Sequence, residues 1–371
     1  MIYLDYQATT PLAPAARDAM LPWLNDRFGN PHSPHRMGRE AAAAVELARM
    51  QVAAPFGDGG RLFFTSGATE AINWALKGLM AAAPPDRRKL VTVATEHACV
   101  LDTARWLEKM GYECAILPVD RDGRVDLDTA RRTIDARTAV VAAMLVNNEI
   151  GTIQPIAALG ERARAAGARM VCDAAQGYGR IAIPIEHCDA VAISAHKVHG
   201  PKGIGALWLR DGVEPEPLLH GGGQEYGLRS GTLSPSLCAG FGAAAAVATE
   251  RMDIDLHHAA ALRDRLLVAL GPDWQVNGGM DHRYPGNLNL RRDGVDAGRL
   301  ISELRQIAFS AGSACASGSG RASHVLSGIG LSDQQARASI RLGFGRYTTE
   351  DEVDRAAVLI EQAAARQWEW A

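Results

Sequence analysis

The sequence lacks the features that would place it in a membrane, in a secretory pathway or on nucleic acid. Its longest apolar run, residues 237–248, is shorter than the roughly 18 residues that a membrane-spanning helix requires. No basic segment precedes an apolar core at the start of the chain, as it would in a signal peptide. The formal net charge is only −3 and no basic block stands out, so no nucleic-acid surface is predicted.

Cysteine pairs and several catalytic signatures are also absent. The motifs GxGxxG, GxxxxGKS/T, HExxH and GxSxG do not occur in complete form, which argues against P-loop, zinc-peptidase and α/β-hydrolase chemistry. Neither close pair of histidines, His32 with His35 or His196 with His199, has the cysteine or carboxylate spacing of a metal site. No CxxC pair occurs among the six cysteines, which favours reduced thiols in the cytoplasm: Cys99, Cys114, Cys172, Cys188, Cys238 and Cys315.

What is present is a repeating pattern of strands and helices. From about residue 60 to 210, short apolar runs alternate with segments of helical period, which predicts an α/β fold with a mostly parallel sheet between helices. Strands are expected at 90–94, 112–119, 139–146, 170–172, 190–193 and 205–209, with helices such as 100–110 and 155–166 between some of them.

After residue 223 the pattern changes. A long helical stretch over 236–270 is expected to join the sheet to a small α+β unit that contains segments 287–290, 300–304 and 351–365. The expected division is a large domain over 16–251 and a small domain formed by 1–15 with 252–371. The length of 371 residues fits two domains.

Polar side chains follow four of the predicted strands at the point where each strand ends. They lie in segments 95–97, 147–149, 173–176 and 194–197. Ligands of parallel α/β sheets bind beyond the carboxyl ends of the strands. Four such clusters therefore predict a site at this edge of the sheet.

Lys197 is the most informative residue of these clusters. Only five of the 39 basic residues are lysines, and this one follows the apolar run 190–193 and precedes Gly200 and Pro201. A lysine at the end of a buried strand can be desolvated, which lowers its pKa and frees its amine for Schiff-base chemistry with a carbonyl cofactor. Taken alone, the pattern favours an ordinary solvated lysine at a strand end, and the rest of the chain is needed to support the reactive amine.

Three further features suit a flat, phosphorylated cofactor, and each has a simpler alternative. Segment 63–70 passes from an apolar strand through Ser66 and Gly67 into a helix, which suits a phosphate but also an ordinary capped helix. Asp173 could face a protonated pyridine nitrogen, or it could cap the next turn. His97 could stack on a ring and shuttle protons, or it could be a structural histidine.

Cys315 and Arg341 are candidates for contact with the substrate. Cys315 lies in a run of glycine, serine and alanine over 310–320 that predicts a mobile, exposed loop, whereas Cys99 is a weaker rival nucleophile. Arg341 alternates with apolar residues, so a buried guanidinium there requires a carboxylate, either of a ligand or of an internal Asp or Glu.

Taken together, these residues resemble those of the cysteine desulfurases, which are pyridoxal-phosphate enzymes of the class V aminotransferase group. The resemblance covers nearly the whole chain. It rests on YLDYQATTP at 3–11, FGNPHS at 28–33, TSGATE at 65–70, TEH at 95–97, NNEIG at 147–151, DAAQ at 173–176, SAHK at 194–197, RSGT at 229–232, GSAC at 312–315 and SIR at 339–341. It implies the aspartate-aminotransferase-type fold, with a seven-stranded sheet in the large domain.

The resemblance also implies a role for each site residue. Lys197 would form the Schiff base with pyridoxal 5′-phosphate, Asp173 would pair with the pyridinium nitrogen, and Gln176 would bond the ring hydroxyl. His97 would stack on the ring and relay protons, and Cys315 would accept the sulfur. The phosphate would be held by the backbone of Ala68, by Thr69, Ser194 and His196, and by Thr232 of the partner subunit. Asn148 would lie at the cofactor and, with Arg341, bind the substrate carboxylate.

The implied activity is removal of sulfur from L-cysteine by a cytoplasmic homodimer, giving L-alanine and a persulfide on Cys315. The persulfide would pass to an acceptor protein or an iron–sulfur scaffold protein, and Cys315 could also serve as a transient ligand of an iron–sulfur cluster. No resident metal, membrane or nucleic acid is implied. The alternatives are a selenocysteine lyase, another class V aminotransferase or lyase, and a non-enzymatic scaffold with the same fold.

Overall fold

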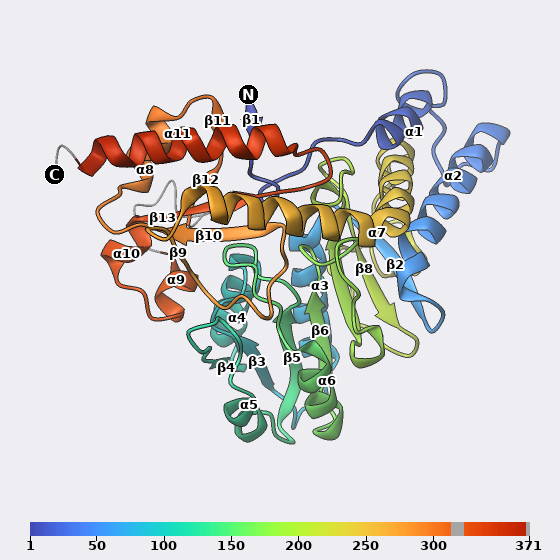
Figure 1. Ribbon diagram of the computed structural model, residues 1–371. Coiled ribbons are helices and arrows are strands. Elements are labelled where there is room, and N and C mark those ends of the chain that lie inside the picture. The colour runs from blue at the N-terminus through green and yellow to red at the C-terminus, as the bar shows by residue number, and fades with distance from the viewer. Residues whose placement is uncertain (313–322, 369–371) are drawn as a thin grey trace.

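The computed structural model describes residues 1–312 and 323–368, and it arranges the chain around a large sheet and a smaller one (Figure 1). Cys315 lies outside the described residues. Within them, no helix has both the length and the apolar character needed to cross a membrane.

The large sheet has seven strands, and four of its neighbouring pairs run parallel. Of these strands, β8 runs antiparallel to both its neighbours, so the prediction of a mostly parallel sheet is confirmed. In spatial order the strands are β2 (Gly60–Thr65), β8 (Gly205–Arg210), β7 (Ala190–Ser194), β6 (Arg169–Asp173), β5 (Thr138–Met144), β3 (Lys89–Val93) and β4 (Glu113–Leu117).

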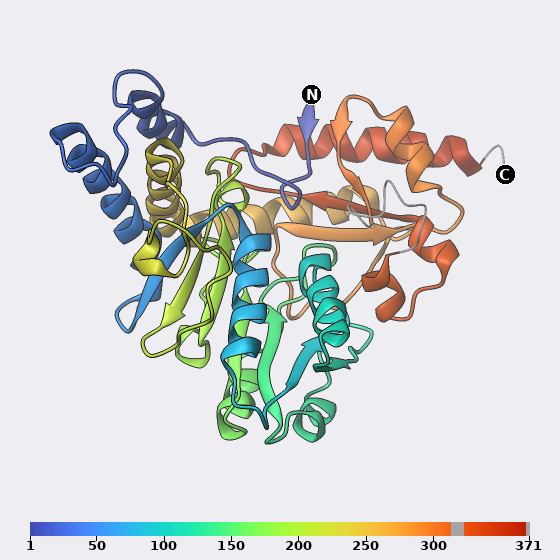
Figure 2. The same cartoon turned by 180° about the vertical axis from the view of Figure 1, so that it is seen from behind.

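Both faces of this sheet are covered by helices, which explains why its central strands are apolar over most of their length. Val91 packs into the core on one face and its neighbour Leu90 into the core on the other. One face packs against α2 (Arg36–Ala53), α5 (Leu127–Thr133), α6 (Ile156–Ala165) and the first half of α7 (Pro235–Leu270). The other packs against α3 (Ala68–Ala82) and α4 (Ala98–Lys109), which lie in front of the sheet in Figure 2.

The smaller sheet is antiparallel and forms a second core. Its order is β12 (Ser310–Ala311), β13 (Ser339–Gly343), β10 (Asn287–Arg291) and β9 (Gln275–Val276). Strand β1 (Ile2–Tyr3) pairs with β11 (Ile307–Ala308) and so brings the N-terminus to this part of the chain. Helix α11 (Glu350–Trp368) and α8 (Ala297–Glu303) each bury residues in this core, whereas α9 (His324–Gly328) and α10 (Asp333–Arg337) pack with Ile150 in a separate cluster.

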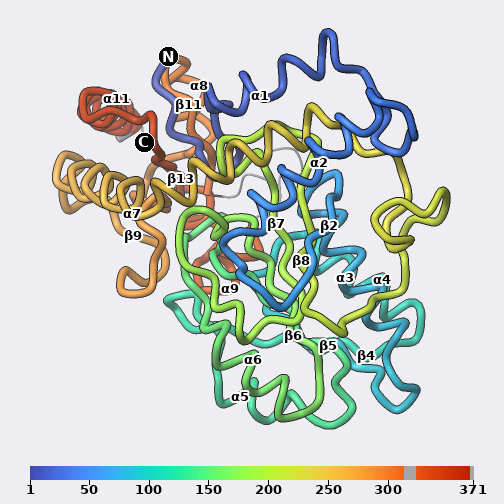
Figure 3. The backbone as a smooth tube through the Cα atoms, turned by 90° about the vertical axis from the view of Figure 1, so that its right-hand side faces the viewer, coloured from blue at the N-terminus to red at the C-terminus, as the bar shows by residue number. Residues whose placement is uncertain are grey.

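Helix α7 connects the two cores, as the sequence predicts. It begins at the Ser234 cap, whose side chain accepts the Leu237 N–H, and it ends at Gly271, which has a φ of +73° that favours glycine. Its first half packs on α1 (Pro14–Leu24) and α2, as Figure 3 shows, whereas Leu262 and Leu266 join the second core. The domain boundaries at 15/16 and 251/252 stay a prediction.

The prediction of an exposed loop over 310–320 is wrong at its start. Ser310 and Ala311 form β12, which pairs with β13, and Gly312 is buried. A side chain on Gly312 would collide with Leu326 and Ser339, so the small residue reflects close packing at this position rather than exposure.

Candidate active site

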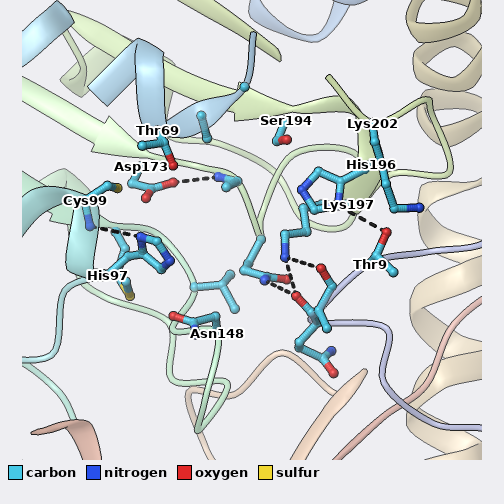
Figure 4. Close-up of a pocket in the computed structure, with 18 of the residues that line it drawn as sticks. Thr9, Thr69, His97, Cys99, Asn148, Asp173, Ser194, His196, Lys197 and Lys202 are labelled. Atoms are coloured by element: carbon cyan, nitrogen blue, oxygen red, sulfur yellow. Dashed lines mark hydrogen bonds between the residues drawn. The ribbon is translucent and has the colours of Figure 1, made fainter. Parts of the chain in front are cut away.

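A cavity of about 580 Å³ lies at the carboxyl ends of β3, β5, β6 and β7, next to β13 of the smaller sheet (Figure 4). Each of the four predicted polar clusters contributes to its wall, together with segment 7–9 and the start of α3. The cluster residues that line it are His97, Asn148, Asp173, Gln176, Ser194, His196 and Lys197. The expected convergence at this edge of the sheet is therefore present.

Some members of the same clusters serve the surrounding structure instead. Glu96 is completely buried, and its Oε1 accepts the Met144 N–H at 2.8 Å. Asn147 accepts the Glu149 N–H at 2.8 Å and so shapes the turn after β5. Neither side chain lines the cavity.

Lys197 ends a short turn, η3 (Ala195–Lys197), that follows β7. Its Nζ donates to the carbonyl oxygens of Gln7 at 2.5 Å and Ala8 at 2.8 Å. Burial, followed by the charges of Arg180 and Arg341, lowers the pKa of Lys197 to about 8. About a tenth of such amines are uncharged at pH 7, so this side chain is suited to attack a carbonyl.

Asp173, the last residue of β6, is a buried carboxylate without an ion-pair partner among the described residues. Its Oδ1 accepts the Ala175 N–H at 2.9 Å, and the structure gives it no second hydrogen bond within 1–312 and 323–368. Burial raises the pKa of Asp173, and the charges of His97 and Lys197 oppose this rise. A cationic ligand in the cavity would relieve the cost of burying this carboxylate.

Gln176 lies one turn beyond Asp173. Its Nε2 donates to the Gln7 carbonyl at 2.9 Å, and its Oε1 accepts from Arg180 Nη1 at 2.6 Å. One hydrogen of Nε2 is left without a partner in the described part of the chain, so the side chain can still donate to a ligand.

His97 caps the N-terminus of α4, and its Nδ1 accepts the Cys99 N–H at 3.1 Å. The neutral ring therefore carries its proton on Nε2. Cys99 also lines the cavity, but burial, then the charges of Asp173 and Glu96, raises the pKa of its thiol far above its ordinary range. This raised pKa argues against Cys99 as the rival nucleophile, because the thiolate is the reactive form.

The start of α3 faces the cavity without a side-chain cap. Its N-cap is Gly67, so the amides of Ala68 and Thr69 are free to bond a ligand. Ser194 lines the same region, and His196 Nδ1 lies 3.2 Å from Thr9 Oγ1 (Figure 4). Burial, then nearby lysine charges, lowers the pKa of His196 to about 4, so its ring is neutral at pH 7.

A glycine keeps this region narrow. A Cβ added to Gly205 would lie only 2.7 Å from the Gly67 Cα, which excludes any larger residue beside the turn before α3. The turn, the free amides and the hydroxyl of Ser194 form a cradle suited to a phosphate group.

Arg341 lies in β13 and is only 1% exposed. Its Nη2 donates to Asp5 Oδ1 at 2.8 Å and to Ser310 Oγ at 3.3 Å, and its Nη1 donates to the Asn148 carbonyl at 3.0 Å. The sequence left open whether Arg341 pairs with a ligand carboxylate or with an internal Asp or Glu. The internal partner is present, and it is Asp5. Arg341 also lines the cavity, and its buried Nε has no partner among the described residues.

One predicted residue, Thr232, is not brought to the cavity of this chain. Thr232 is exposed between η4 (Glu225–Gly227) and α7, and it does not line the cavity. Cys315 falls outside the described residues, so its place stays a prediction.

The sequence analysis missed Asp5 and Arg180. Asp5 reaches Arg341 across 336 positions of sequence, and no local pattern marks such a contact. Arg180 lies four residues after Gln176. This spacing is compatible with a local contact between the two side chains, but it does not indicate that the guanidinium also contacts the Lys197 segment.

The cavity fits the cofactor that the resemblance implies. It offers an amine of lowered pKa, a buried carboxylate with no counterion in the described part of the chain, and an uncapped helix start. Pyridoxal 5′-phosphate has an aldehyde, a basic ring nitrogen and a phosphate, one for each of these groups.

Comparisons with known proteins agree with this chemistry. The model of the family Aminotransferase class-V matches residues 2–356. The chain is 45% identical over 368 residues to "Cysteine desulfurase IscS" of Rickettsia bellii (strain OSU 85-389), covering 97% of this chain and 90% of that relative.

Two solved structures share the fold. A NifS-like protein superposes with a TM-score of 0.91 at 33% identity, over 98% of this chain and 99% of the other. A structure described as SspA in complex with cysteine superposes with a TM-score of 0.84 at 34% identity, over 94% and 100%.

Proposed function

Because this chain belongs to the class-V aminotransferase family, among its cysteine desulfurases, we propose that it removes sulfur from L-cysteine with pyridoxal 5′-phosphate. The products are L-alanine and a persulfide on Cys315. The observation that carries the proposal is the meeting of the Lys197 amine, the Asp173 carboxylate and the open start of α3 in one cavity.

The residues at the sheet edge would hold the cofactor. Lys197 would be the covalent attachment point, Asp173 would hold the proton on the ring nitrogen, and Gln176 would donate to the ring hydroxyl. The cofactor, when bound, supplies an electron-withdrawing ring that stabilises negative charge at the substrate Cα. The amides of Ala68 and Thr69, the side chains of Ser194 and His196, and Thr232 of the partner subunit would hold the phosphate.

The residues near β13 would bind and orient the substrate. Arg341 and Asn148 take its carboxylate, which places the amino group toward Lys197. The Lys197 amine removes the Cα proton, because its lowered pKa leaves a usable neutral fraction near pH 7. His97 would stack on the ring of the bound cofactor and relay protons through Nε2, since its Nδ1 accepts the Cys99 N–H.

Cys315 would take the sulfur. Its thiolate attacks the substrate sulfur, an S–S bond forms and the C–S bond breaks. The carbon keeps the electron pair and is protonated to give L-alanine. The persulfide then moves to an acceptor or iron–sulfur scaffold protein, and we propose that the enzyme acts as a homodimer in the cytoplasm.

Covalent mapping of the cofactor tests the central assignment. Borohydride treatment of the loaded enzyme followed by peptide mapping should mark Lys197, and Lys197→Ala should end turnover. Lys202→Ala is the matched control, because Lys202 also lines the cavity but has no assigned covalent role. An unmodified Lys197, or turnover in its alanine variant, refutes the attachment.

A second variant tests the sulfur step. Cys315→Ala should keep the visible absorbance of the bound cofactor and abolish alanine formation from cysteine. Cys114→Ala, on β4 and away from the cavity, serves as the control. Full activity of Cys315→Ala would remove Cys315 from the reaction.

A further inference from the structure

Arg180 lies behind Lys197 and joins three segments of the site. Its Nη2 donates to the Lys197 carbonyl at 2.7 Å and to the Tyr6 carbonyl at 3.1 Å, and its Nη1 donates to Gln176 Oε1 at 2.6 Å. Its guanidinium also lies over the ring of Tyr284, with 5.4 Å to the ring centroid. It thus connects the N-terminal segment, the turn after β6 and the turn after β7.

The cation has no carboxylate partner among the described residues. It is partly buried and lines a second, small cavity of about 30 Å³ behind Lys197, with His199, Asp255 and Arg346 in the same wall. Asp255 is already paired with Arg346 at 2.7 Å, so it does not neutralise Arg180. Burial lowers the pKa of Arg180, which nevertheless stays charged, because guanidinium pKa values start above 12.

An unpaired cation in a poorly solvated place is costly, and stability alone does not account for it. The charged groups that act on the Lys197 amine are Arg180 and Arg341, which favour its neutral form, and Asp5 and Asp173, which favour its protonated form. Arg341 is paired with Asp5, so Arg180 is the cation of this set that has no carboxylate of its own.

We propose that Arg180 is a positioning residue whose uncompensated charge favours the neutral form of the buried Lys197 amine, while its hydrogen bonds hold the main chain that orients this amine. The two effects act together. The Arg180 bond to the Tyr6 carbonyl fixes the segment whose next two carbonyls, of Gln7 and Ala8, accept from Lys197 Nζ. This inference rests on the proposed function, in which the neutral amine captures the cofactor aldehyde.

The test measures the amine itself rather than turnover. The full-length chain, freed of cofactor, is methylated reductively with formaldehyde and cyanoborohydride between pH 6 and 10, and Lys197 modification is followed by peptide mapping. Wild type should reach half its limiting rate near pH 8. In Arg180→Met the amine should titrate at a higher pH than in wild type, because only burial and Arg341 then oppose its protonation, so modification at pH 7 should be roughly three- to tenfold slower.

Matched variants separate charge from fold. Arg180→Lys keeps the charge and should behave as wild type to within about twofold at pH 7. Arg283→Met is the control for loss of a buried arginine, because Arg283 is 5% exposed, donates to main-chain carbonyls and lines neither cavity. It should leave the Lys197 profile unchanged. In Arg180→Met, the rate at which the chain captures pyridoxal phosphate at pH 7 should fall by the same factor as the rate of methylation. In Arg180→Lys and Arg283→Met neither rate should fall in this way.

Several results overturn the inference. These are an Arg180→Met profile equal to wild type, a wild-type Lys197 that titrates as an ordinary lysine, and an Arg180→Lys profile as shifted as that of Arg180→Met. Failure of both Arg180→Met and Arg180→Gln to fold, judged by circular dichroism, assigns the residue to structure and also overturns it. If mapping finds the cofactor elsewhere than on Lys197, the proposed function fails, whereas the methylation profiles still decide the charge effect.

Discussion

Replacing Arg341 by lysine tests the proposed substrate-carboxylate site most directly. The substitution keeps a positive charge in β13 but removes the planar fork of donors. Arg341 uses Nη1 for the Asn148 carbonyl and Nη2 for Asp5, and it keeps a buried Nε without a partner. A lysine ammonium can donate a hydrogen bond to Asp5 or to a ligand, but it cannot donate from Nε and both terminal nitrogens within one plane, as a guanidinium can.

The size of the effect follows from these contacts. A hydrogen bond between charged groups contributes about 1.5–3 kcal/mol, and every 1.4 kcal/mol is a factor of ten in affinity. Loss of one such bond to the substrate carboxylate should therefore raise the KM for L-cysteine about 10- to 100-fold. The value of kcat should change much less, because the carboxylate is bound equally before and during the reaction.

The assay is steady-state formation of alanine over a range of cysteine concentrations. Arg291→Lys is the matched control, because Arg291 lies in the neighbouring strand β10, also has a buried Nε without a partner, and does not line the cavity. Circular dichroism would confirm that both variants fold. An unchanged KM in Arg341→Lys, or an equal rise in Arg291→Lys, refutes the assignment of Arg341 to the substrate.

Three predictions concern stability. Burial raises the pKa of Glu96, so the folded state keeps a proton that the unfolded chain loses as the pH rises above about 4.3. Glu96→Gln should therefore raise the melting temperature at pH 8 but not at pH 4.5. An equal gain at both pH values would contradict this reasoning. Burial, then the charge of Arg346, lowers the pKa of His199 to about 4, so the stability of the fold decreases as the pH drops below about 6.5. In His199→Asn the melting temperature should depend less on acid pH, and asparagine tolerates the φ of +64° that the backbone has at position 199. Arg49→Met should lower the free energy of unfolding, measured in urea, by roughly 3–5 kcal/mol, because the Glu225 side chain is 2% exposed and would lose its bidentate partner. A loss below about 1 kcal/mol, which is typical of exposed ion pairs, would contradict a buried pair.

The sheet could be predicted from the sequence because its signal is local. Strands covered on both faces form nearly continuous apolar runs, and residues 190–193 and 139–144 show this directly. Parallel strands place their carboxyl ends at one edge, so the polar residues after β3, β5, β6 and β7 had to meet there. The presence of His97, Asp173 and Lys197 in one cavity follows from that rule.

Other features required the tertiary structure. The run over 310–312 has the composition of a loop, yet pairing with β13 makes its first residues a strand, because a small side chain also suits close packing. The partner of Arg341 was left open, since a sequence shows that a guanidinium is buried but not which carboxylate lies beside it. Asp5 does so from the other end of the chain.

The sequence by itself thus determined which residue types meet at the edge of the sheet, through periodicity and through motifs a few residues long. Only the tertiary structure decided their protonation and their pairing. The pKa of Lys197 depends on burial and on Arg180, Arg341, Asp5 and Asp173, which come from distant segments. Desolvation and Coulomb interactions depend on distance in space, and separation along the chain does not determine that distance.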